Sequence, residues 1–272
     1  MKRAAVLAIL FLIFVVSVPP AAAITNGELD GEGHPAVGLM VADIDGVPVW
    51  RCSGTLIAPR VFLTAGHCAG DGATAARVWF GADLNDIRDI DYPYGGVIAI
   101  EGTPIPHPDY VWAWPDPHDV GVVILDQAVT DIPLATLPTP GLLTQLNDDG
   151  ILVEGRKRDS VFFTSVGYGL QLTWPPHVFE GDFYRRVSQS EYVSMNKVYL
   201  NLSQKMVFDE GGSCSGDSGG PVYWTDPLGN EIIVAVTSAG DGGCMATGFD
   251  YRVDLPDILQ WIQDQIALAE AG

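Results

Sequence analysis

Beyond residue 24 the chain alternates short runs of apolar residues with turns rich in glycine, proline and aspartate. The runs show either a two-residue alternation or a continuous apolar stretch, the patterns of half-buried and fully buried strands. Many short strands with frequent turns favour a closed barrel or a sandwich over βαβ units. The predicted strands cover residues 37–44, 47–52, 54–57, 61–64, 76–80, 96–100 and 120–125, and then 161–166 and 232–237.

The end of the chain has a helical spacing instead. Apolar residues recur at Leu255, Ile258, Leu259, Ile262 and Ile266, on one face of a helix. We expect this face to pack on a barrel, so the apolar stripe belongs to the core and is not a binding face.

The first 23 residues are expected to be a secretory signal peptide. Two basic residues precede an apolar run over 4–18, and three alanines ending at Ala23 supply a small-residue cleavage pattern. The run is shorter than the roughly 20 residues of a spanning helix, and no later segment is long enough. We therefore predict a secreted mature chain that begins at Ile24 and has no membrane anchor.

Composition and charge limit the partners. Of 272 residues 47% are hydrophobic and 18% charged, enough for one large domain or two cores of about a hundred residues each. The formal net charge of −20 argues against nucleic acid or an anionic membrane, because phosphate would be repelled. We interpret the acidity as a soluble secreted surface, with attraction of basic substrates as the alternative.

A connector containing proline, threonine and aspartate, at about 127–155, separates two groups of strands. We place a domain boundary at Leu137, which gives an N-terminal domain over 24–137 and a C-terminal domain over 138–272. A segment at 170–181, rich in tryptophan, proline and phenylalanine, reads as an inserted loop. We expect it to pack on the domain; the alternative is that it lines a cleft.

The stretch at 211–221 has five glycines in eleven residues around Ser218. A serine hydroxyl is a poor nucleophile until a base takes its proton, so the chain must also supply a histidine and a carboxylate. His67 follows an apolar strand, between small residues and a cysteine, as suits a base of fixed orientation. Asp119 opens the apolar run at 120–125, where a buried charge requires a donor. The remaining histidines are expected at surface or turn positions: His34, His107, His118 and His177.

Three motifs, TAGHC at 64–68, HDVGVVIL at 118–125 and GDSGGP at 216–221, resemble in this order the chymotrypsin/trypsin-like serine proteases. The resemblance runs from Ile24 to the C-terminal helix. It implies an all-β fold of two six-stranded antiparallel β-barrels with a C-terminal α-helix. The first barrel would carry the base His67 and the orienting Asp119, and the second would carry the nucleophile Ser218.

The resemblance implies further roles around this triad. Backbone N–H groups of Gly216 and Ser218 would form an oxyanion hole. The free amino group of Ile24 would pair with Asp217 after signal-peptide removal; the alternative is an ordinary start at Ile24 and a turn capped by Asp217. Four cysteines alone allow three pairings, and secretion favours oxidised thiols. The pairings that the resemblance implies are Cys52–Cys68 and Cys214–Cys244.

The resemblance also places a primary specificity pocket, with Gly212 at its base and, around it, Ser213, Ser238, Gly240 and Gly248. Trypsin-like members have an aspartate at the base. An uncharged pocket with small walls predicts a preference for large apolar or aromatic residues before the scissile bond. At its edge the chain departs from the family, with Asp241 near the rim and Ala239 in place of the usual tryptophan.

The sequence therefore predicts a monomeric serine endopeptidase that acts on proteins or peptides, is a target of protein protease inhibitors, and uses no cofactor or metal. The alternative is a non-catalytic binding protein on the same fold. An α/β-hydrolase esterase is disfavoured, because it would place its serine first and long helices between its strands. Glycosylation at Asn201 is not expected, and calcium binding is left open at Asp83, Asp86, Asp89 and Asp91.

Overall fold

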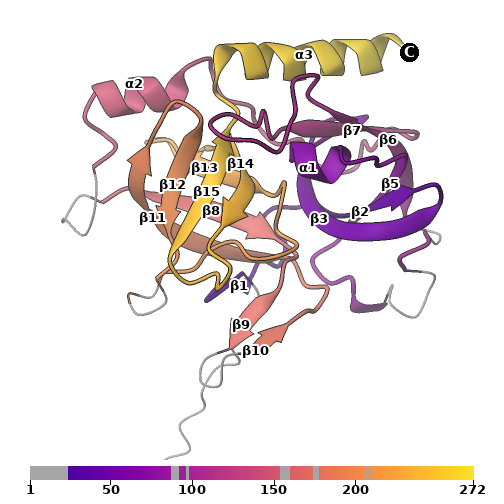
Figure 1. Cartoon of the computed structure of the whole chain (residues 1–272), viewed down its shortest axis with the longest axis horizontal. Helices are drawn as coiled ribbons and strands as arrows, with labels where there is room; N and C mark the ends of the chain where they lie inside the picture. Colours follow the sequence, from indigo (N-terminus) through magenta and orange to yellow (C-terminus); the bar gives the residue numbers. More distant parts are fainter. Residues whose placement is uncertain are drawn as a thin grey trace, which may run out of the picture.

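The computed structural model describes residues 24–86, 92–95, 98–153, 160–173, 178–205, 208 and 210–272. Its strands form two barrels that lie side by side, with the C-terminal helix running across the top of both (Figure 1). Each barrel closes with six strands, and the neighbouring strands are antiparallel. The predicted all-β fold of two six-stranded barrels is confirmed.

The first barrel has its strands in the order β2 (Val37–Ile44), β3 (Val47–Ala58), β4 (Val61–Thr64), β7 (Gly121–Leu125), β6 (Ile100–Pro106) and β5 (Ala75–Phe80). The two strands predicted at 47–52 and 54–57 are one strand, because Gly54 continues the ladder opposite Gly38. A side chain at Gly54 would collide with the Phe62 ring, 2.4 Å from its Cβ position. The strand predicted at 96–100 was placed too early: β6 begins at Ile100, and residues 96 and 97 lie outside the described residues.

The second barrel runs β8 (Phe162–Gly167), β11 (Arg186–Met195), β12 (Tyr199–Ser203), β15 (Thr247–Arg252), β14 (Glu231–Gly240) and β13 (Pro221–Thr225), and β13 pairs back onto β8. A short strand, β1 (Glu28–Leu29), adds to β11. The sequence did not predict β11 or β12. Polar residues of β11 are buried as well as apolar ones, so its sequence lacks the polar-out alternation of a half-exposed strand.

The segment at 170–181 forms a separate hairpin of β9 (Gln171–Thr173) and β10 (Val178–Glu180). Figure 1 shows this hairpin projecting from the barrels. Val178 and Phe179 are both exposed. Packing of the whole segment on the domain stays a prediction, and residues 174–177 lie outside the described residues.

The helices are α1 (Gly66–Ala69), α2 (Leu142–Asp148) and α3 (Pro256–Ala271). Proline at the first turn of α3 is well placed, because no intrahelical donor is needed there. The predicted apolar face of α3 is confirmed as core, with Ile258, Leu259 and Ile262 buried. Although α3 follows the second barrel in sequence, it contacts β4 and β7 of the first barrel.

The connector between β7 and β8 touches both barrels, since Ala135 N–H donates to Leu56 O and Ile233 N–H donates to Thr136 O. The predicted boundary at Leu137 lies within this connector. Apolar side chains fill both barrel interiors, and another buried cluster unites residues of the two barrels, including Leu63 and Val120 with Tyr168 and Tyr251. Within the described ranges, no helix is long and apolar enough to cross a membrane.

Candidate active site

His67 lies on α1, the short helix that directly follows β4. The next residue, Cys68, forms a disulfide with Cys52 of β3, so the helix is fastened to the barrel wall. Gly66 packs so closely that a Cβ there would lie 3.1 Å from the Asp119 Cα atom. The backbone N–H of His67 donates to Asp119 Oδ1 over 2.8 Å. These contacts fix the backbone of His67 independently of the contacts that its imidazole makes.

Asp119 is fully buried at the entrance of β7 and lies beside the histidine. His67 Nδ1 is 3.1 Å from Asp119 Oδ1 and 3.0 Å from Oδ2. The Ser238 hydroxyl, from β14 of the second barrel, donates to Oδ2 over 2.6 Å. With Nδ1–H directed at the carboxylate, Nε2 is left as the proton-accepting nitrogen.

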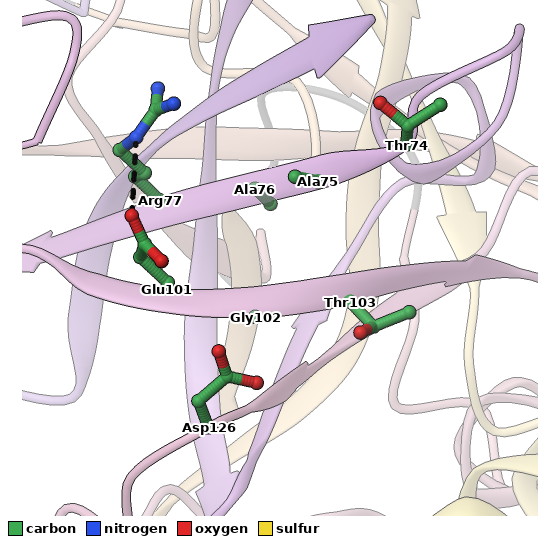
Figure 2. Close-up of a pocket in the computed structure, with 8 residues that line it drawn as sticks. All are labelled: Thr74, Ala75, Ala76, Arg77, Glu101, Gly102, Thr103 and Asp126. Atoms are coloured by element: carbon green, nitrogen blue, oxygen red, sulfur yellow. Dashed lines mark ion pairs between the residues drawn. The ribbon is translucent and has the colours of Figure 1, made fainter. Parts of the chain in front are cut away.

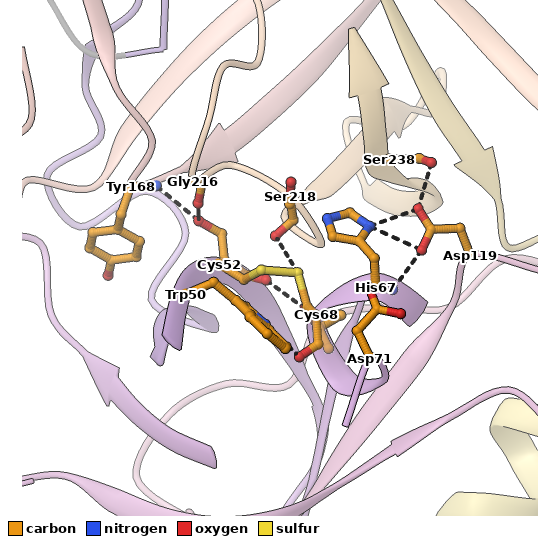
Figure 3. The surroundings of a disulfide bond; sticks show 12 residues. Trp50, Cys52, His67, Cys68, Asp71, Asp119, Tyr168, Gly216, Ser218 and Ser238 are labelled. Carbon is orange, nitrogen blue, oxygen red and sulfur yellow. Dashed lines mark hydrogen bonds and ion pairs between the residues drawn. A yellow bond between two sulfur atoms is a disulfide. The ribbon is translucent and has the colours of Figure 1, made fainter. Parts of the chain in front are cut away.

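Ser218 belongs to the loop before β13 and lies on the side of the His67 ring that faces away from Asp119 (Figure 3). Its carbonyl accepts a 2.8 Å hydrogen bond from Ser53 N–H of the first barrel. No hydrogen bond joins the Ser218 hydroxyl to His67 among the described residues. Such contacts in substrate-free sites are often long and tighten when substrate binds, so the absence of this bond does not count against Ser218 as the candidate nucleophile.

Some backbone N–H groups of the loop around Ser218 have no hydrogen-bond acceptor among the described residues. Asp217 N–H donates to Cys214 O and Gly219 N–H donates to Thr237 O. In the part of the chain that the structure describes, the N–H groups of Gly216 and Ser218 donate to no protein atom. Gly216 has φ +98°, a conformation that favours glycine. Two backbone donors without a partner in the described residues, beside a candidate nucleophile, are the groups that an oxyanion hole requires.

Asp217 is fully buried beneath this loop. Its carboxylate accepts from Gly169 N–H over 2.7 Å and from Cys214 N–H over 2.9 Å. Burial raises the pKa of the Asp217 carboxyl to about 6, although these two donors and the Arg51 guanidinium act in the opposite direction. A Cβ on Gly169 would lie 2.2 Å from Asp217 Oδ2, which explains the glycine there.

The segment at Ile24 docks beside the same loop. The backbones of Thr25 and Gly212 exchange two hydrogen bonds of 3.0 Å, and the Ile24 side chain is fully buried. In the uncut chain the Ile24 nitrogen belongs to a peptide bond, so it carries no charge to offer Asp217. The predicted ion pair therefore stays a prediction for the cleaved chain.

The residues predicted to form the specificity pocket surround a side chain that the prediction omitted, Gln204. A Cβ on Gly212 would lie 2.2 Å from Gln204 Cγ, one on Gly248 would lie 2.9 Å from Nε2, and one on Gly240 would lie 3.9 Å from Oε1. Gln204 Nε2 donates to Ser213 O over 3.0 Å and to Ser213 Oγ over 3.1 Å. The space above Gly212 is thus occupied rather than open.

The second predicted disulfide, Cys214–Cys244, is present and ties the nucleophile loop to the segment after β14. Both pairings implied by the resemblance are therefore formed. Of the pocket residues, Ser238 directs its hydroxyl at Asp119 and so belongs to the triad's surroundings.

The comparisons with known proteins agree with this geometry. A family model described as Trypsin matches residues 36–262, which is most of the chain. The chain belongs to the trypsin family. It is 29% identical to a chymotrypsin of Phaedon cochleariae over 90% of this chain and 83% of that protein, and 28% identical to trypsin 5G1 of Aedes aegypti over 78% and 74%. The solved structure of HL collagenase has the same fold, with a TM-score of 0.63, 20% identity and coverage of 90% of this chain and 99% of its own.

The sequence analysis missed an aromatic side chain that lies beside His67 in this trypsin-family chain. Trp112, on the loop between β6 and β7, meets the His67 ring edge-on with 5.5 Å between centroids, and it is 61% exposed. The loop has no periodic pattern, so its sequence gave no signal for this contact.

Other sequence expectations have mixed outcomes. His107 opens a turn, since Tyr110 N–H donates to its carbonyl, but its side chain is buried, stacked on His118 and edge-on to Trp261. The expected turn position is confirmed, and a surface position was wrong. His177, Asp89 and Asp91 lie outside the described residues, and the calcium question stays open.

A hollow on the first barrel lies apart from these residues (Figure 2). It is lined by Arg77 and Glu101, on β5 and β6, and by Asp126. The Arg77 guanidinium is 3.9 Å from the Glu101 carboxylate and also pairs with the buried Asp43. Since its cation already has acidic partners in the protein, this hollow is explained as a surface feature of the barrel.

Substitution of Gly219, next to Ser218, should lower the free energy of unfolding measurably. Gly219 has φ +78°, and a Cβ there would lie 2.1 Å from Thr64 Oγ1 and 2.6 Å from Ala65 N. We expect Gly219→Ala to destabilise the fold by about 2 to 5 kcal/mol, from left-handed strain plus overpacking between the barrels.

The matched control is Gly229→Ala, where φ is +88° but nothing lies within 4 Å of the added Cβ. It should show the strain alone, about 1 to 2 kcal/mol. Denaturant unfolding of both variants measures the difference, and equal losses would contradict the crowding at Gly219.

Proposed function

We propose that this chain is a secreted serine endopeptidase that cleaves peptide bonds through Ser218, His67 and Asp119. The observation that carries the proposal is the buried Asp119 carboxylate, which contacts His67 Nδ1 and leaves Nε2 for Ser218. Membership of the trypsin family and the names of its relatives, chymotrypsin and trypsin, support the same reaction class.

In the proposed reaction His67 Nε2 takes the proton of Ser218 Oγ as the oxygen attacks the substrate carbonyl carbon. The resulting imidazolium is stabilised by Asp119 and then donates the proton to the leaving amine. Water, deprotonated by the same imidazole, attacks the acyl-enzyme and releases the acid, which regenerates the Ser218 hydroxyl.

The oxyanion formed on the substrate would accept hydrogen bonds from Gly216 and Ser218 N–H. A donor of this kind is worth roughly 3 kcal/mol in the transition state. The fixed orientation of these groups depends on the loop that Asp217 anchors. We propose that the amino group of Ile24, once freed from residues 1–23, pairs with Asp217 and completes the loop.

We further propose that the protein is a secreted monomer that cleaves proteins or peptides. A protein inhibitor of proteases would be a second partner. The predicted preference for large apolar or aromatic residues before the cleaved bond stays a prediction. It depends on open space above Gly212, and the Gln204 side chain takes up that space.

The test is reaction of the purified secreted protein with a serine-directed fluorophosphonate, followed by mass spectrometry of the intact chain and of its labelled peptide. We expect one adduct, on Ser218, on a chain beginning at Ile24. Ser218→Ala is the control and should take up no label. A folded, disulfide-bonded wild-type chain without an adduct would refute the proposal and favour a non-catalytic binding protein.

A further inference from the structure

A histidine at the end of the N-terminal segment, residues 24–34, lies between two carboxylates. His34 Nδ1 is 2.5 Å from Asp30 Oδ1, and His34 Nε2 is 3.0 Å from Oε2 of Glu231, the first residue of β14. A neutral imidazole has one N–H donor and one acceptor nitrogen, whereas an imidazolium has two N–H donors. Ionised carboxylates only accept hydrogen bonds, so both contacts are satisfied only when His34 is protonated.

Asp30 connects this histidine to a buried arginine. The Asp30 side chain is 1% exposed, and its Oδ2 accepts from Arg185 Nε over 2.6 Å. Arg185, from the chain just before β11, also donates to Gly31 O over 2.7 Å. Loss of one member of such a buried ion pair is costly, because the remaining charge is left without a partner. Paired charges therefore hold the end of the N-terminal segment on the second barrel.

The protonated histidine also balances the charge of the cluster. Asp30 and Glu231 supply two negative charges, and Arg185 and the imidazolium supply two positive ones. The His34 ring stacks on the Tyr223 ring of β13, with 5.3 Å between centroids and 24° between planes, and the face of a tyrosine ring attracts a cation. Asp30 from its own segment, Glu231 from β14 and Tyr223 from β13 thus face the ring, and Arg185 acts on it through Asp30.

Electrostatics agrees with this geometry. Burial lowers the pKa of His34, but the hydrogen bonds and charges of Asp30 and Glu231 outweigh burial and raise that pKa above its ordinary value of 6.5. Burial in turn raises the pKa of Asp30, yet His34 and Arg185 hold it below its ordinary value of 3.8. Both directions are those of an imidazolium paired with a carboxylate.

We propose that protonated His34, bound between Asp30 and Glu231, is a pH-sensitive latch that holds the N-terminal segment on the second barrel. The same segment carries the backbone pairing of Thr25 with Gly212, six residues or fewer from Asp30. The inference concerns how this segment docks, and it does not depend on the proposed protease function.

Loss of the proton should open the latch. A neutral His34 would direct one lone pair at a carboxylate oxygen, and the two carboxylates would share the single cation of Arg185. Because the pKa of His34 is higher in the folded chain than its value of about 6.5 in the unfolded chain, the stabilisation is complete below about pH 6.5. It is lost as the pH rises through the folded-state pKa.

The first measurement is the protonation of His34 in the secreted protein carrying Ser218→Ala, which prevents self-digestion. Nuclear magnetic resonance of the imidazole nitrogens, assigned with a His34→Gln variant, gives both the number of ring protons and the pKa. We expect two ring protons at pH 6 and a pKa above 6.5. A ring with one proton at pH 6, or a pKa at or below 6.5, would overturn the proposal.

The second measurement compares stability with and without the imidazole. At pH 6, His34→Gln should raise the unfolding equilibrium constant about tenfold or more, the effect of losing a hydrogen bond between charged groups. At pH 9 the factor should be smaller, because the wild type has lost the same interaction. The Ile24 amine and Asp217 titrate in both proteins, so their effects cancel. An equal factor at both pH values would indicate a merely structural residue and contradict the latch.

Hydrogen exchange shows whether the segment itself responds. The Thr25 N–H donates to Gly212 O and the Asp30 N–H donates to Arg185 O, both over 3.0 Å. We expect the protection factors of these two amides to fall about tenfold between pH 6 and pH 9 in the parent protein. In His34→Gln the fall should be smaller. Protection that does not change with pH in the parent protein would refute the latch.

A matched pair of variants tests the contact with β14. Glu231→Gln removes the charge that faces His34 Nε2 and should lower the pKa of His34. Glu32→Gln removes the same charge from an exposed side chain in the turn that contains His34, and should leave that pKa close to its value in the parent protein. Equal decreases in the two variants would show that the ring responds to overall charge rather than to Glu231, against the proposal.

Discussion

Replacing Ser218 with alanine should lower kcat/KM by about 10⁶-fold, because loss of one triad member removes nearly the whole effect of the triad. His67 and Asp119 would keep their contact, but no oxygen would remain to form the acyl-enzyme. Peptide hydrolysis with purified variant and wild type measures the loss. The residual rate should come from substrate binding and the oxyanion donors alone.

The matched control is Ser215→Ala, which removes an exposed hydroxyl from the same loop. We expect its activity to stay within a few-fold of wild type and both variants to unfold with wild-type cooperativity. Turnover retained by a pure Ser218→Ala protein would show that another group is the nucleophile.

Leaving two residues, Ala22 and Ala23, ahead of Ile24 should lower kcat by about 100-fold or more, the cost of losing an oxyanion donor. The extension removes the charged amine that Asp217 would bind, and the N–H groups of Gly216 and Ser218, which have no partner among the described residues, flank that aspartate. Active-site titration followed by single-turnover ester hydrolysis measures the effect. Two alanines added after Gly272 are the control, and equal kcat for the chains beginning at Ala22 and at Ile24 would contradict the ion pair.

Asp217 makes this comparison depend on pH. Its pKa is about 6 in the folded uncut chain, against an ordinary value of 3.8. Between these values the native state holds more protons than the unfolded state, so its stability falls as pH rises, by about 3 kcal/mol for this group. A paired amine offsets that loss. In a Ser218→Ala background, the chain beginning at Ile24 should therefore gain stability over the extended chain between about pH 4 and 6.

The three residues of the proposed triad could be singled out from the sequence because each lies in a short local motif. His67, Asp119 and Ser218 each directly follow or precede a strongly apolar strand or a glycine turn, and local chemistry restricts what such residues do. Strands β2 and β4 and helix α3 were predictable for a related reason, since a single apolar pattern determines each of them.

The pocket could not be predicted in the same way. Gln204 directly follows β12, a strand without a clear alternating pattern, and its amide contacts Ser213 only nine residues further along the chain. Its position beside Gly248 depends on the pairing of β12 with β15, and a single sequence does not determine such a register between strands far apart in the chain.

The hydrogen bonds from Ser53 N–H to Ser218 O and from Ser238 Oγ to Asp119 both cross between the barrels. The first barrel holds His67 and Asp119, and the second holds Ser218, so neither barrel alone contains all the groups of the proposed reaction. On this proposal, hydrolysis requires the association of the two barrels, and a chain divided in its connector would regain activity only when the two fragments reassemble.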